Sequence, residues 1–547
     1  MRQTRHGGLL ALLLLALPAL AFAQSGGADG SNLIQILLLG LVVALIVVVV
    51  VMTANSFLGV EARATGAERK TGERFGIIPS RDELFAKDLP KGVDRSEVHF
   101  LRQGFDINLL GEPEPVIEDK PAMTYAVQPP NFIGMSPIPK VEPAVGDTVR
   151  AGDVLFYDKK RPDIKYCSPV SGEVIEINRG EKRAITSVVV LADRETDFAR
   201  HEVPDLATAD RELLLGYLQA TGVWPMIRQR PYNVVADPAD TPKGIFVSTF
   251  DTAPLAPDLN FALRGEEASF QRGLDVLARL TPGSVHLGLD ASREPAAAFR
   301  DARGVEKHYF RGEHPAGNVG VHIHHVDPVA ADQIVWTVNA QDVVAIGRLF
   351  TEGIFDTTRV VALTGAEFER PHYVRTKLGA KLADLIRGEL TDSENDVRLI
   401  SGDVLSGATK APEGFLDFYD DQVTTIEEGN YFELFGWLLP IDPRPSRSGT
   451  YPNKLFGKDF KFRANTNSHG EKRAFVVTGE YEAVLPMDIL PQHLMKAIMV
   501  NDFERMEGLG IYELVEEDVA LCEFACVSKQ PLQRILREGL EVMREQG

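Results

Sequence analysis

The sequence predicts an α+β multidomain protein that follows an apolar N-terminal segment. Its 547 residues exceed what one hydrophobic core usually organises. Short Val/Ile-rich runs separated by Gly-Asp and Pro-x-x-Gly turns occupy residues 141–191, as in compact antiparallel strands. Between residues 200 and 365, strand-like and helix-like runs alternate, which is typical of a parallel α/β layer. These three observations together predict the class.

Residues 1–23 have the pattern of a secretory signal peptide. The positively charged "MRQTRHGG" precedes an apolar run, Leu9–Ala23, that ends in Ala-Phe-Ala. As a helix this run is only about 22 Å long, shorter than the ~30 Å core of a bilayer. We therefore interpret it as a signal peptide cut after Ala23. The alternative is an uncleaved first membrane helix.

A second apolar run, Leu33–Met52, predicts a transmembrane helix within residues 24–55. It has no charged residue, and 16 of its residues are Leu, Ile or Val. Residues 24–32 contain no Lys or Arg, whereas four basic residues follow the run: Arg63, Arg69, Lys70 and Arg74. The positive-inside rule then predicts a single-pass protein with its large domain on the cytoplasmic side. The polar residues 56–97 are expected to form a cytoplasmic linker.

Residues 98–200 resemble the barrel-sandwich fold of lipoyl and biotinyl domains. A lipoyl-lysine would stand at the tip of a symmetric tight turn. The Asp158-Lys159-Lys160 segment places its lysines about two residues early and predicts a lopsided hairpin. We therefore expect a barrel-sandwich hybrid domain in which these lysines are solvated loop charges.

Residues 201–365 predict an α/β domain. Gly244–Phe250 and Val360–Thr364 have the composition of buried strands, and Glu266–Leu280 has apolar residues at helical spacing. No G-x-G-x-x-G or G-x-x-x-x-G-K-[ST] motif follows any strand. The sequence therefore predicts a Rossmann-like layer without a phosphate loop.

The last two regions are a β-grasp-like domain with following strands, at residues 366–485, and a helical domain, at residues 486–547. Residues 368–410 predict the order strand, helix, strand, which suits a small β-grasp module. Apolar residues recur at helical intervals in the C-terminal region: Leu490, Leu494, Ile498, Ile535, Leu540 and Met543.

Charge and cysteine content exclude several kinds of protein. A net charge of −20 argues against nucleic-acid binding, which needs a basic surface. Three cysteines cannot form a disulfide framework. Cys522 and Cys526 lie at i, i+4 of an expected helix, far in sequence from Cys167. We interpret the pair as small apolar helix residues.

Residues 314–328 contain four of the twelve histidines. On a strand, His322 and His324 would share a face and could supply half of a tetrahedral zinc shell, while His325 would point away. The glycines and prolines of this stretch predict a tight loop that leads into a short strand. Only Asp327 stands near to complete a shell, so no metal site is predicted here. A subunit contact, or the polar lining of a former nucleotide site, is the expected role.

Ordered blocks from about residue 98 to the end resemble one protein family. They are "VGDTVRAGDVLFYDKK", "SGEVIEINRGEKRAI", "IFVSTFDTAPLAPD", "HPAGNVGVHIHHVDP", "NAQDVVAIGRLFTEG", "RVVALTG", "VRTKLGA", "RLISGDVLSG", "LFGWLLP", "YEAVLPMDILP" and "YELVEEDVALCEFAC". Together they resemble the A subunit of the Na+-translocating NADH:quinone oxidoreductase, a bacterial respiratory pump. The first ~97 residues have no counterpart in the usual soluble family member, which makes the N-terminal extension a departure.

The resemblance implies a subunit of a complex in the bacterial inner membrane that couples NADH oxidation and quinone reduction to Na+ export. The isolated chain is not expected to be catalytic, and it would have no catalytic residue of its own. The FMN, FAD and iron–sulfur centres belong to sister subunits, so this chain is expected to bind no cofactor or metal itself. The expected partners are the membrane and flavin subunits, with quinone possible and nucleic acid excluded.

By the same resemblance, two segments lie near the quinone end of the pathway, Gln128–Met135 and Trp224–Asn233. Aromatic and apolar side chains there suit a quinone ring and its tail, and an arginine suits a quinone carbonyl. The candidates are Phe132, Met135, Trp224, Ile227, Arg228, Arg230 and Tyr232. The alternative is that the aromatics are interdomain core and the arginines are surface or subunit contacts.

Two other protein classes remain as alternatives. An Rnf-type electron-transfer subunit is related to the family, but its clusters need C-x2-C-x2-C-x3-C-P runs that this chain lacks. A membrane-anchored efflux adaptor would also have one N-terminal span and a lipoyl-like domain. It would require a long helical hairpin between Gly146 and Gly172, and the sequence predicts none there.

Overall fold

The structure is a computed structural model that describes residues 30–64, 89–391, 396–433, 443–447 and 460–546. The chain divides into two compact units, one formed by residues 1–88 and 94–97 and the other by residues 89–93 and 98–547. The expected signal peptide, residues 1–23, lies outside the described residues.

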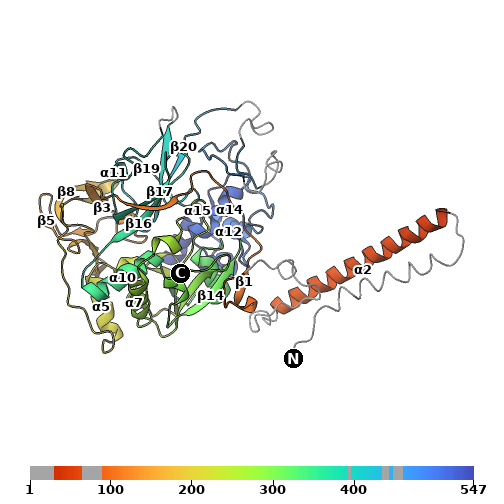
Figure 1. Ribbon diagram of the computed structural model, residues 1–547, viewed down its shortest axis with the longest axis horizontal. Coiled ribbons are helices and arrows are strands. Elements are labelled where there is room, and N and C mark those ends of the chain that lie inside the picture. Colours follow the sequence, from red (N-terminus) through yellow and green to blue (C-terminus); the bar gives the residue numbers. More distant parts are fainter. Residues whose placement is uncertain (1–29, 65–88, 392–395, 434–442, 448–459, 547) are drawn as a thin grey trace. The chain divides into compact units, whose positions relative to one another are not determined.

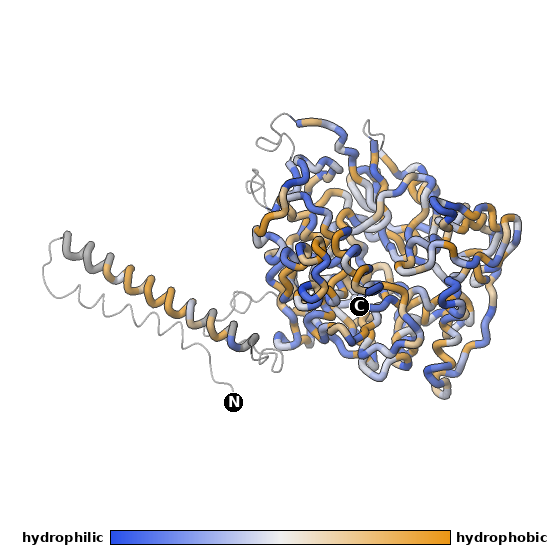
Figure 2. The backbone as a smooth tube through the Cα atoms, turned by 180° about the vertical axis from the view of Figure 1, so that it is seen from behind, coloured by the Kyte–Doolittle hydropathy of each residue, from blue (hydrophilic) through white to orange (hydrophobic). Residues whose placement is uncertain are grey.

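Among the residues of the first unit that the structure describes, one long helix occurs, α2 at Gly30–Ala64. Figure 2 shows that its central turns are hydrophobic. Over the part of the chain that the structure describes, no helix has the length and apolarity needed to cross a membrane. The transmembrane prediction for residues 33–52, and the single-pass location that depends on it, are therefore not supported.

The second unit contains two small antiparallel sheets near its N-terminal end. One has the order β3-β9-β8-β5, with β3 at Thr124–Val127, β9 at Ile185–Ala192, β8 at Gly172–Arg179 and β5 at Thr148–Val149. The other has the order β4-β6-β7, with β4 at Lys140–Val141, β6 at Val154–Asp158 and β7 at Arg161–Cys167. Burial alternates at the start of β8, whereas β3 and β9 contain runs of consecutive buried residues, so both sheets contribute to the core. The predicted barrel-sandwich domain is confirmed.

The hairpin between β6 and β7 has a tight tip and an uneven stem. Asp158 pairs with Arg161, so Lys159 and Lys160 form a two-residue turn and both are exposed at its tip. The predicted lopsidedness lies just beyond this turn: the next pair is Tyr157 with Lys165, so residues 162–164 of β7 have no counterpart in β6.

A seven-stranded sheet forms the α/β layer, in the order β1-β14-β13-β12-β15-β10-β11. Its strands are β1 Val98–Phe100, β14 Glu306–Arg311, β13 Ser284–Asp290, β12 Gly244–Ser248, β15 Val335–Val338, β10 Ile227–Arg230 and β11 Val234–Val235. The strands from β1 to β15 run parallel, and β10 is antiparallel to β15. The predicted parallel layer is confirmed.

Two helices of this layer, α7 (Glu267–Leu277) and α10 (Ala340–Glu352), pack side by side (Figure 1). Gly347 makes their close approach possible, because a Cβ there would lie 1.8 Å from the carbonyl oxygen of Ser269. The remaining helices of the layer are α5 Arg211–Ala220, α6 Leu259–Ala262, α8 Ala297–Arg300 and α9 Val319–Val326.

The third sheet has six strands in the order β19-β18-β20-β16-β17-β2. They are β19 Ala408–Lys410, β18 Val397–Ser401, β20 Gln422–Glu427, β16 Thr358–Thr364, β17 His372–Lys377 and β2 Glu114–Asp119. A short helix, α11 (Leu382–Leu385), lies between β17 and β18 in the chain, which gives the predicted order of strand, helix and strand. The strand expected at residues 360–364 of the α/β layer lies in this sheet instead, because a buried apolar run has the same composition in either place.

Four helices form most of the C-terminal region: α12 Pro491–Met499, α13 Phe503–Gly508, α14 Glu516–Ala525 and α15 Leu532–Gln546. Five of the six apolar residues that predicted helices here are buried, namely Leu494, Ile498, Ile535, Leu540 and Met543. The sixth, Leu490, precedes α12 and is 52% exposed. The helical prediction is confirmed.

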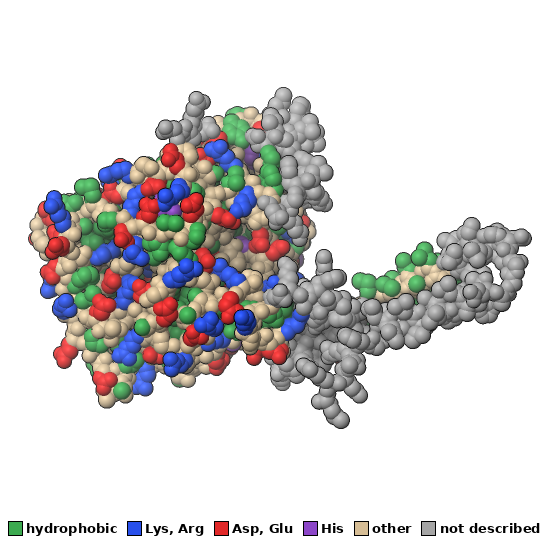
Figure 3. Space-filling view, in the orientation of Figure 1, with side chains coloured by type: hydrophobic (Ala, Val, Ile, Leu, Met, Phe, Trp, Pro, Cys, Tyr) green, Lys and Arg blue, Asp and Glu red, His purple; other side chains and the backbone are tan. Residues whose placement is uncertain are grey.

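Acidic and basic side chains are interspersed over the face of the second unit seen in Figure 3. Many of them pair, as Arg375 does with Asp119 at 2.7 Å and Arg293 with Asp290 at 3.1 Å. This face therefore shows no continuous basic surface of the kind that nucleic-acid binding needs.

Candidate functional site

Two of the predicted quinone-contacting residues, Trp224 and Ile227, lie in the hydrophobic core. Both side chains are fully buried. The indole Nε1 of Trp224 donates to the carbonyl oxygen of Ala236 at 2.8 Å, and its ring meets that of Trp336 edge-on at 5.4 Å. These contacts fix the start of β10 against β15. In this conformation, neither residue is available to a ligand.

Phe132 joins the barrel-sandwich domain to the loop that precedes β20. Its ring is buried and lies 4.5 Å from Tyr166, 4.9 Å from Phe418 and 6.1 Å from Tyr419, measured between ring centroids. Met135 packs half-buried against the same core. This aromatic cluster brings the first predicted segment, residues 128–135, against the six-stranded sheet.

A small pocket adjoins this cluster. Its cavity volume is about 10 Å³, and the hollow around it, about 260 Å³, is partly open solvent. Its polar lining residues are Gln128, Asn131 and Thr357, and the others are Ala126, Val127, Cys167, Pro169, Phe355, Leu378, Gly379 and Phe418. Ligand pockets usually measure about 300–1,000 Å³. The cavity is about large enough for one water molecule, so in this conformation the pocket has no room for a quinone ring unless its lining moves.

Arg228 contacts the same aromatic cluster as Phe132, through the ring of Tyr419. Its guanidinium lies 4.8 Å from the ring centroid of Tyr419 and donates one N–H to the Oδ1 of Asn339 at 3.2 Å. The Tyr419 hydroxyl donates to the carbonyl oxygen of Pro225 at 2.7 Å, so burial and this contact fix the ring. The side chain of Arg228 is only half-buried. It is the better placed of the two predicted arginines for a ligand.

Arg230 points into a different part of the core. Its side chain is 2% exposed and forms ion pairs with Asp518 at 3.0 Å and Glu517 at 2.6 Å, both on α14. Asp518 is itself fully buried, and burial raises the pKa of its carboxyl to about 6 although Arg230 opposes the shift. Tyr232 follows after a turn and meets Tyr512 edge-on at 6.0 Å. The structure thus separates Arg230 and Tyr232 from the cluster around Phe132.

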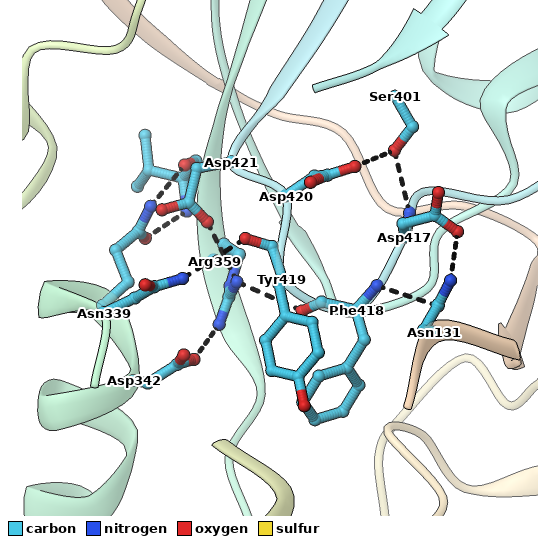
Figure 4. A network of polar contacts seen from close by, with 12 residues as sticks. Asn131, Asn339, Asp342, Arg359, Ser401, Asp417, Phe418, Tyr419, Asp420 and Asp421 are labelled. Carbon is cyan, nitrogen blue, oxygen red and sulfur yellow. Dashed lines mark hydrogen bonds and ion pairs between the residues drawn. The ribbon is translucent and has the colours of Figure 1, made fainter. Parts of the chain in front are cut away.

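A buried polar network that the sequence did not indicate lies next to Arg228. Figure 4 shows Arg359 of β16 between Asp342 of α10 and Asp421, which immediately precedes β20. Arg359 is 2% exposed; it pairs with Asp421 at 3.0 Å and also with Asp342. Burial raises the pKa of Asp342 to about 6. The available signal was a lone charge within each of two apolar runs, "TTRVVALT" and "AQDVVAIG".

Asp420 gives this network a measurable pH dependence. Its Oδ2 accepts a hydrogen bond from Ser401 at 2.6 Å, and burial together with the Asp417 carboxylate raises its pKa to about 7. The folded state therefore holds this proton to a higher pH than the unfolded chain, whose Asp pKa is about 4. The stability that Asp420 contributes is complete below about pH 4 and is lost as the pH rises through about 7.

Replacing Asp420 by Asn is expected to flatten this decline. Because an amide cannot ionise, Asp420→Asn should be more stable than the natural chain at pH 8 by roughly 1–2 kcal/mol, with little difference at pH 4. Urea unfolding between pH 4 and 8 measures this, with the exposed Asp332→Asn as the matched control. Parallel stability curves for Asp420→Asn and the natural chain would show that Asp420 does not titrate in this range.

The histidine-rich stretch is helical, so the predicted strand is wrong. Helix α9 runs from Val319 to Val326. Its histidines make three separate contacts: His322 Nε2 with the carbonyl oxygen of Ala316 at 2.8 Å, His324 Nδ1 with Glu513 at 2.7 Å, and His325 Nε2 with the carbonyl oxygen of Pro486 at 2.8 Å. They therefore tie α9 to its own preceding turn and to the C-terminal region.

Cys522 and Cys526 lie on and just after α14, and both are buried. The hydroxyl of Tyr481 donates to the Sγ of Cys526 at 2.8 Å. Burial raises the pKa of the Cys522 thiol, so it stays protonated at neutral pH. The interpretation as apolar helix residues agrees with this packing.

Family models match three consecutive parts of the chain. The NqrA N-terminal barrel-sandwich hybrid domain matches residues 100–193, the NqrA second alpha/beta domain residues 209–355 and the NQRA C-terminal domain residues 360–411. The A subunit of the Na(+)-translocating NADH-quinone reductase of Alcanivorax borkumensis is 41% identical over 455 residues, which are 82% of this chain and 99% of that protein. The chain belongs to the NqrA family.

Other NqrA relatives match to the same extent. The A subunits of the same reductase from Saccharophagus degradans and Neisseria meningitidis serogroup A are 42% and 41% identical, each over 82% of this chain and 99% of their own length. Among solved structures, an NAD+-reducing [NiFe]-hydrogenase matches at 15% identity over 42% of this chain and 52% of its own, with a TM-score of 0.29. That likeness is too slight to carry an argument about the NqrA fold or its site.

Proposed function

We propose that this chain is the A subunit of a Na+-translocating NADH:quinone reductase. The observation that carries the proposal is the 41% identity to a relative of that name over 99% of the relative's length. So complete a match covers all three folded regions, and the assembled enzyme couples NADH oxidation and quinone reduction to Na+ export. The chain acts as one subunit, with the flavins and iron–sulfur centres on its sisters.

Within that complex, the folded second unit faces the cytoplasm of a bacterium, beside the membrane and flavin subunits and near the quinone end of the pathway. The resemblance of the two segments at residues 128–135 and 224–233 supports this position. The efflux-adaptor alternative has less support, because β5, β6 and β7 occupy the range in which its helical hairpin would lie.

Deletion and complementation test the proposed function. Membranes from a deletion strain should lose Na+-stimulated NADH:quinone reductase activity, and the full chain should restore it. Affinity purification of the chain should recover the flavin-containing sister subunits with it. Full Na+-stimulated activity in the deletion strain would refute the proposal. Protection of the second unit from external protease in intact spheroplasts tests the cytoplasmic position.

We further propose that quinone approaches this chain at the pocket lined by Gln128 and Phe418 once its lining opens. Arg228 lies near this pocket through Tyr419, whose ring contacts both Phe132 and Arg228. Gln128 and Asn131 line the pocket and both donate to the Asp417 carboxylate, at 3.1 and 2.6 Å. They present polar groups beside the Phe418 ring, which suits a quinone head group. Of the seven residues predicted from the sequence, none lines the pocket itself, but Phe132, Met135 and Arg228 belong to or contact the adjoining aromatic cluster.

Replacing Arg228 by Met is expected to raise the KM for quinone about tenfold in the assembled enzyme, because a hydrogen bond from a cation to a carbonyl is lost. The free energy of unfolding should fall by less than about 1 kcal/mol, since Arg228 is half-buried and stacks on one ring. Steady-state kinetics with a short-chain quinone measure the KM. Arg264→Met, which removes another arginine stacked on a ring, is the control. An unchanged KM would remove Arg228 from the quinone path.

A further inference from the structure

Three potential metal ligands meet on one face of the seven-stranded sheet, apart from the network around Arg359. They are His286 on β13 and Glu306 and His308 on β14, and their ligand atoms all lie within 4.8 Å of one another. His286 Nδ1 is 3.0 Å from His308 Nε2 and 3.5 Å from Glu306 Oε2. The sequence indicated none of the three, because His286 lies on a different strand, twenty residues or more before Glu306 and His308.

The register of two parallel strands brings these side chains together. His286 is directly opposite Glu306, and Gly288 is directly opposite His308. Since alternate residues of a strand point to the same face, these four positions form one block on one side of the sheet. Three corners of the block carry ligands, and the fourth is a glycine.

The spacing fits a tetrahedral transition metal. With metal–ligand bonds of about 2.0–2.1 Å, neighbouring ligand atoms of a tetrahedral zinc site are ~3.3 Å apart. The observed 3.0 and 3.5 Å lie on either side of this value. Two imidazoles and one carboxylate are also a ligand set that zinc uses when the fourth position is left to water. Glu306 is 58% exposed, so that position is open to solvent.

The surroundings hold the ligands in place. His286 stacks on Phe246 at 4.5 Å, and Ser284 donates to Glu306 at 2.6 Å. The nearby cation Lys243 is paired with Asp327 at 2.8 Å.

A further buried imidazole covers the glycine corner. A Cβ on Gly288 would lie 2.3 Å from the Nδ1 of His322, so only glycine lets the His322 ring approach the sheet there. That ring is 2% exposed, and its Nδ1 has no hydrogen-bond partner among the described residues. A buried nitrogen without a partner beside the block is an unusual and costly feature, and it is independent of the spacing of the three ligands.

We propose that His286, Glu306 and His308 form a binding site for one Zn2+ ion, with water in the fourth position. The ion would join β13 to β14 beneath α9 and take the place of the hydrogen bond between the two imidazoles. This site is separate from the proposed quinone path and does not depend on the proposed function.

Calorimetric titration of the full chain with ZnCl2 tests the proposal. The chain is purified without a polyhistidine tag and stripped with a chelator. One Zn2+ per chain should bind, and His308→Gln and Glu306→Gln should each weaken binding at least about tenfold. His493→Gln, which alters an exposed histidine on α12, should bind Zn2+ as the natural chain does.

Co2+ provides a second measurement that does not depend on affinity. Bound at this site it should give the strong visible absorption of a four-coordinate ion, and this absorption should disappear in His308→Gln but persist in His493→Gln. Circular dichroism establishes that the variants are folded. Absence of stoichiometric Zn2+ binding, or equal binding by Glu306→Gln, His308→Gln and the natural chain, would overturn the proposal.

Discussion

Replacing Arg359 by Met is expected to lower the free energy of unfolding by about 3–5 kcal/mol, because removing one partner of a buried ion pair leaves an uncompensated charge. Arg359 is the only cation paired with Asp342 among the described residues, and Asp342 is fully buried with its Oδ2 already lacking a partner. Denaturant unfolding followed by tryptophan fluorescence at pH 8 measures the loss. At pH 5 the loss should be smaller, since Asp342 can then take up a proton.

A second substitution separates the lost pair from lost packing. In Arg359→Met/Asp342→Leu both charges are absent, so much of the stability should return, as it does when buried pairs are replaced by apolar residues. Arg150→Ala removes an arginine whose side chain is 54% exposed and should change the free energy of unfolding little, because exposed ion pairs contribute little. A cost for Arg359→Met as small as that for Arg150→Ala would mean that water reaches Asp342.

The sequence predicted best those elements whose pattern is local. The α/β alternation, the small antiparallel sheets and the C-terminal helices all appear where apolar residues have a period of 2 or 3.6. It did not predict that β1 pairs with β14, or β2 with β17. Each of these pairs joins residues about 200 or more apart, and no local pattern specifies such a partner. Residues 98–119 therefore contribute to both larger sheets.

In the histidine stretch, the spacing of the apolar residues indicates the helix that the structure contains, whereas the histidines, glycines and prolines do not. Val319, Ile323 and Val326 are spaced i, i+4, i+7 and pack together with Phe246, which is the spacing of a helix that faces a sheet. The glycines and prolines of the stretch, together with two histidines at i, i+2, favoured a loop and a short strand instead. Gly317 and the cis His314–Pro315 bond precede this helix, and Gly320 lies within its first turn without interrupting it.

The candidate site was only partly accessible to sequence. Gln128 and Asn131 of the first segment line a pocket, but the predicted Phe132, Met135 and Arg228 do not; Arg228 and Phe132 both contact Tyr419. The role of Arg230 was not distinguishable from that of Arg228, because residues i and i+2 of a strand have the same face and the same chemistry. What separates them is α14, which approaches only Arg230 and comes from almost 300 residues further along the chain.

Replacing Arg230 by Ala is therefore expected to impair folding and not quinone binding. The substitution leaves Asp518 buried without its cation, so the free energy of unfolding should fall by about 3–5 kcal/mol. Arg230→Lys keeps a charge but cannot reach Asp518 and Glu517 together, and should recover part of the loss. Thermal and urea unfolding of the purified chain measure both. In the complex that still assembles, the KM for quinone should equal that of the natural enzyme.

Comparing the Arg230 and Arg228 variants distinguishes a role in folding from a role in quinone binding. Arg228→Met should change the KM and leave stability nearly unaltered, while Arg230→Ala should do the reverse. The deficit of Arg230→Ala should also shrink between pH 8 and pH 5, since Asp518, whose pKa already lies near 6, becomes protonated once its partner is removed. A stable Arg230→Ala chain with a raised KM would place Arg230 at the quinone instead, and would require α14 to move away from β10 in the assembled enzyme.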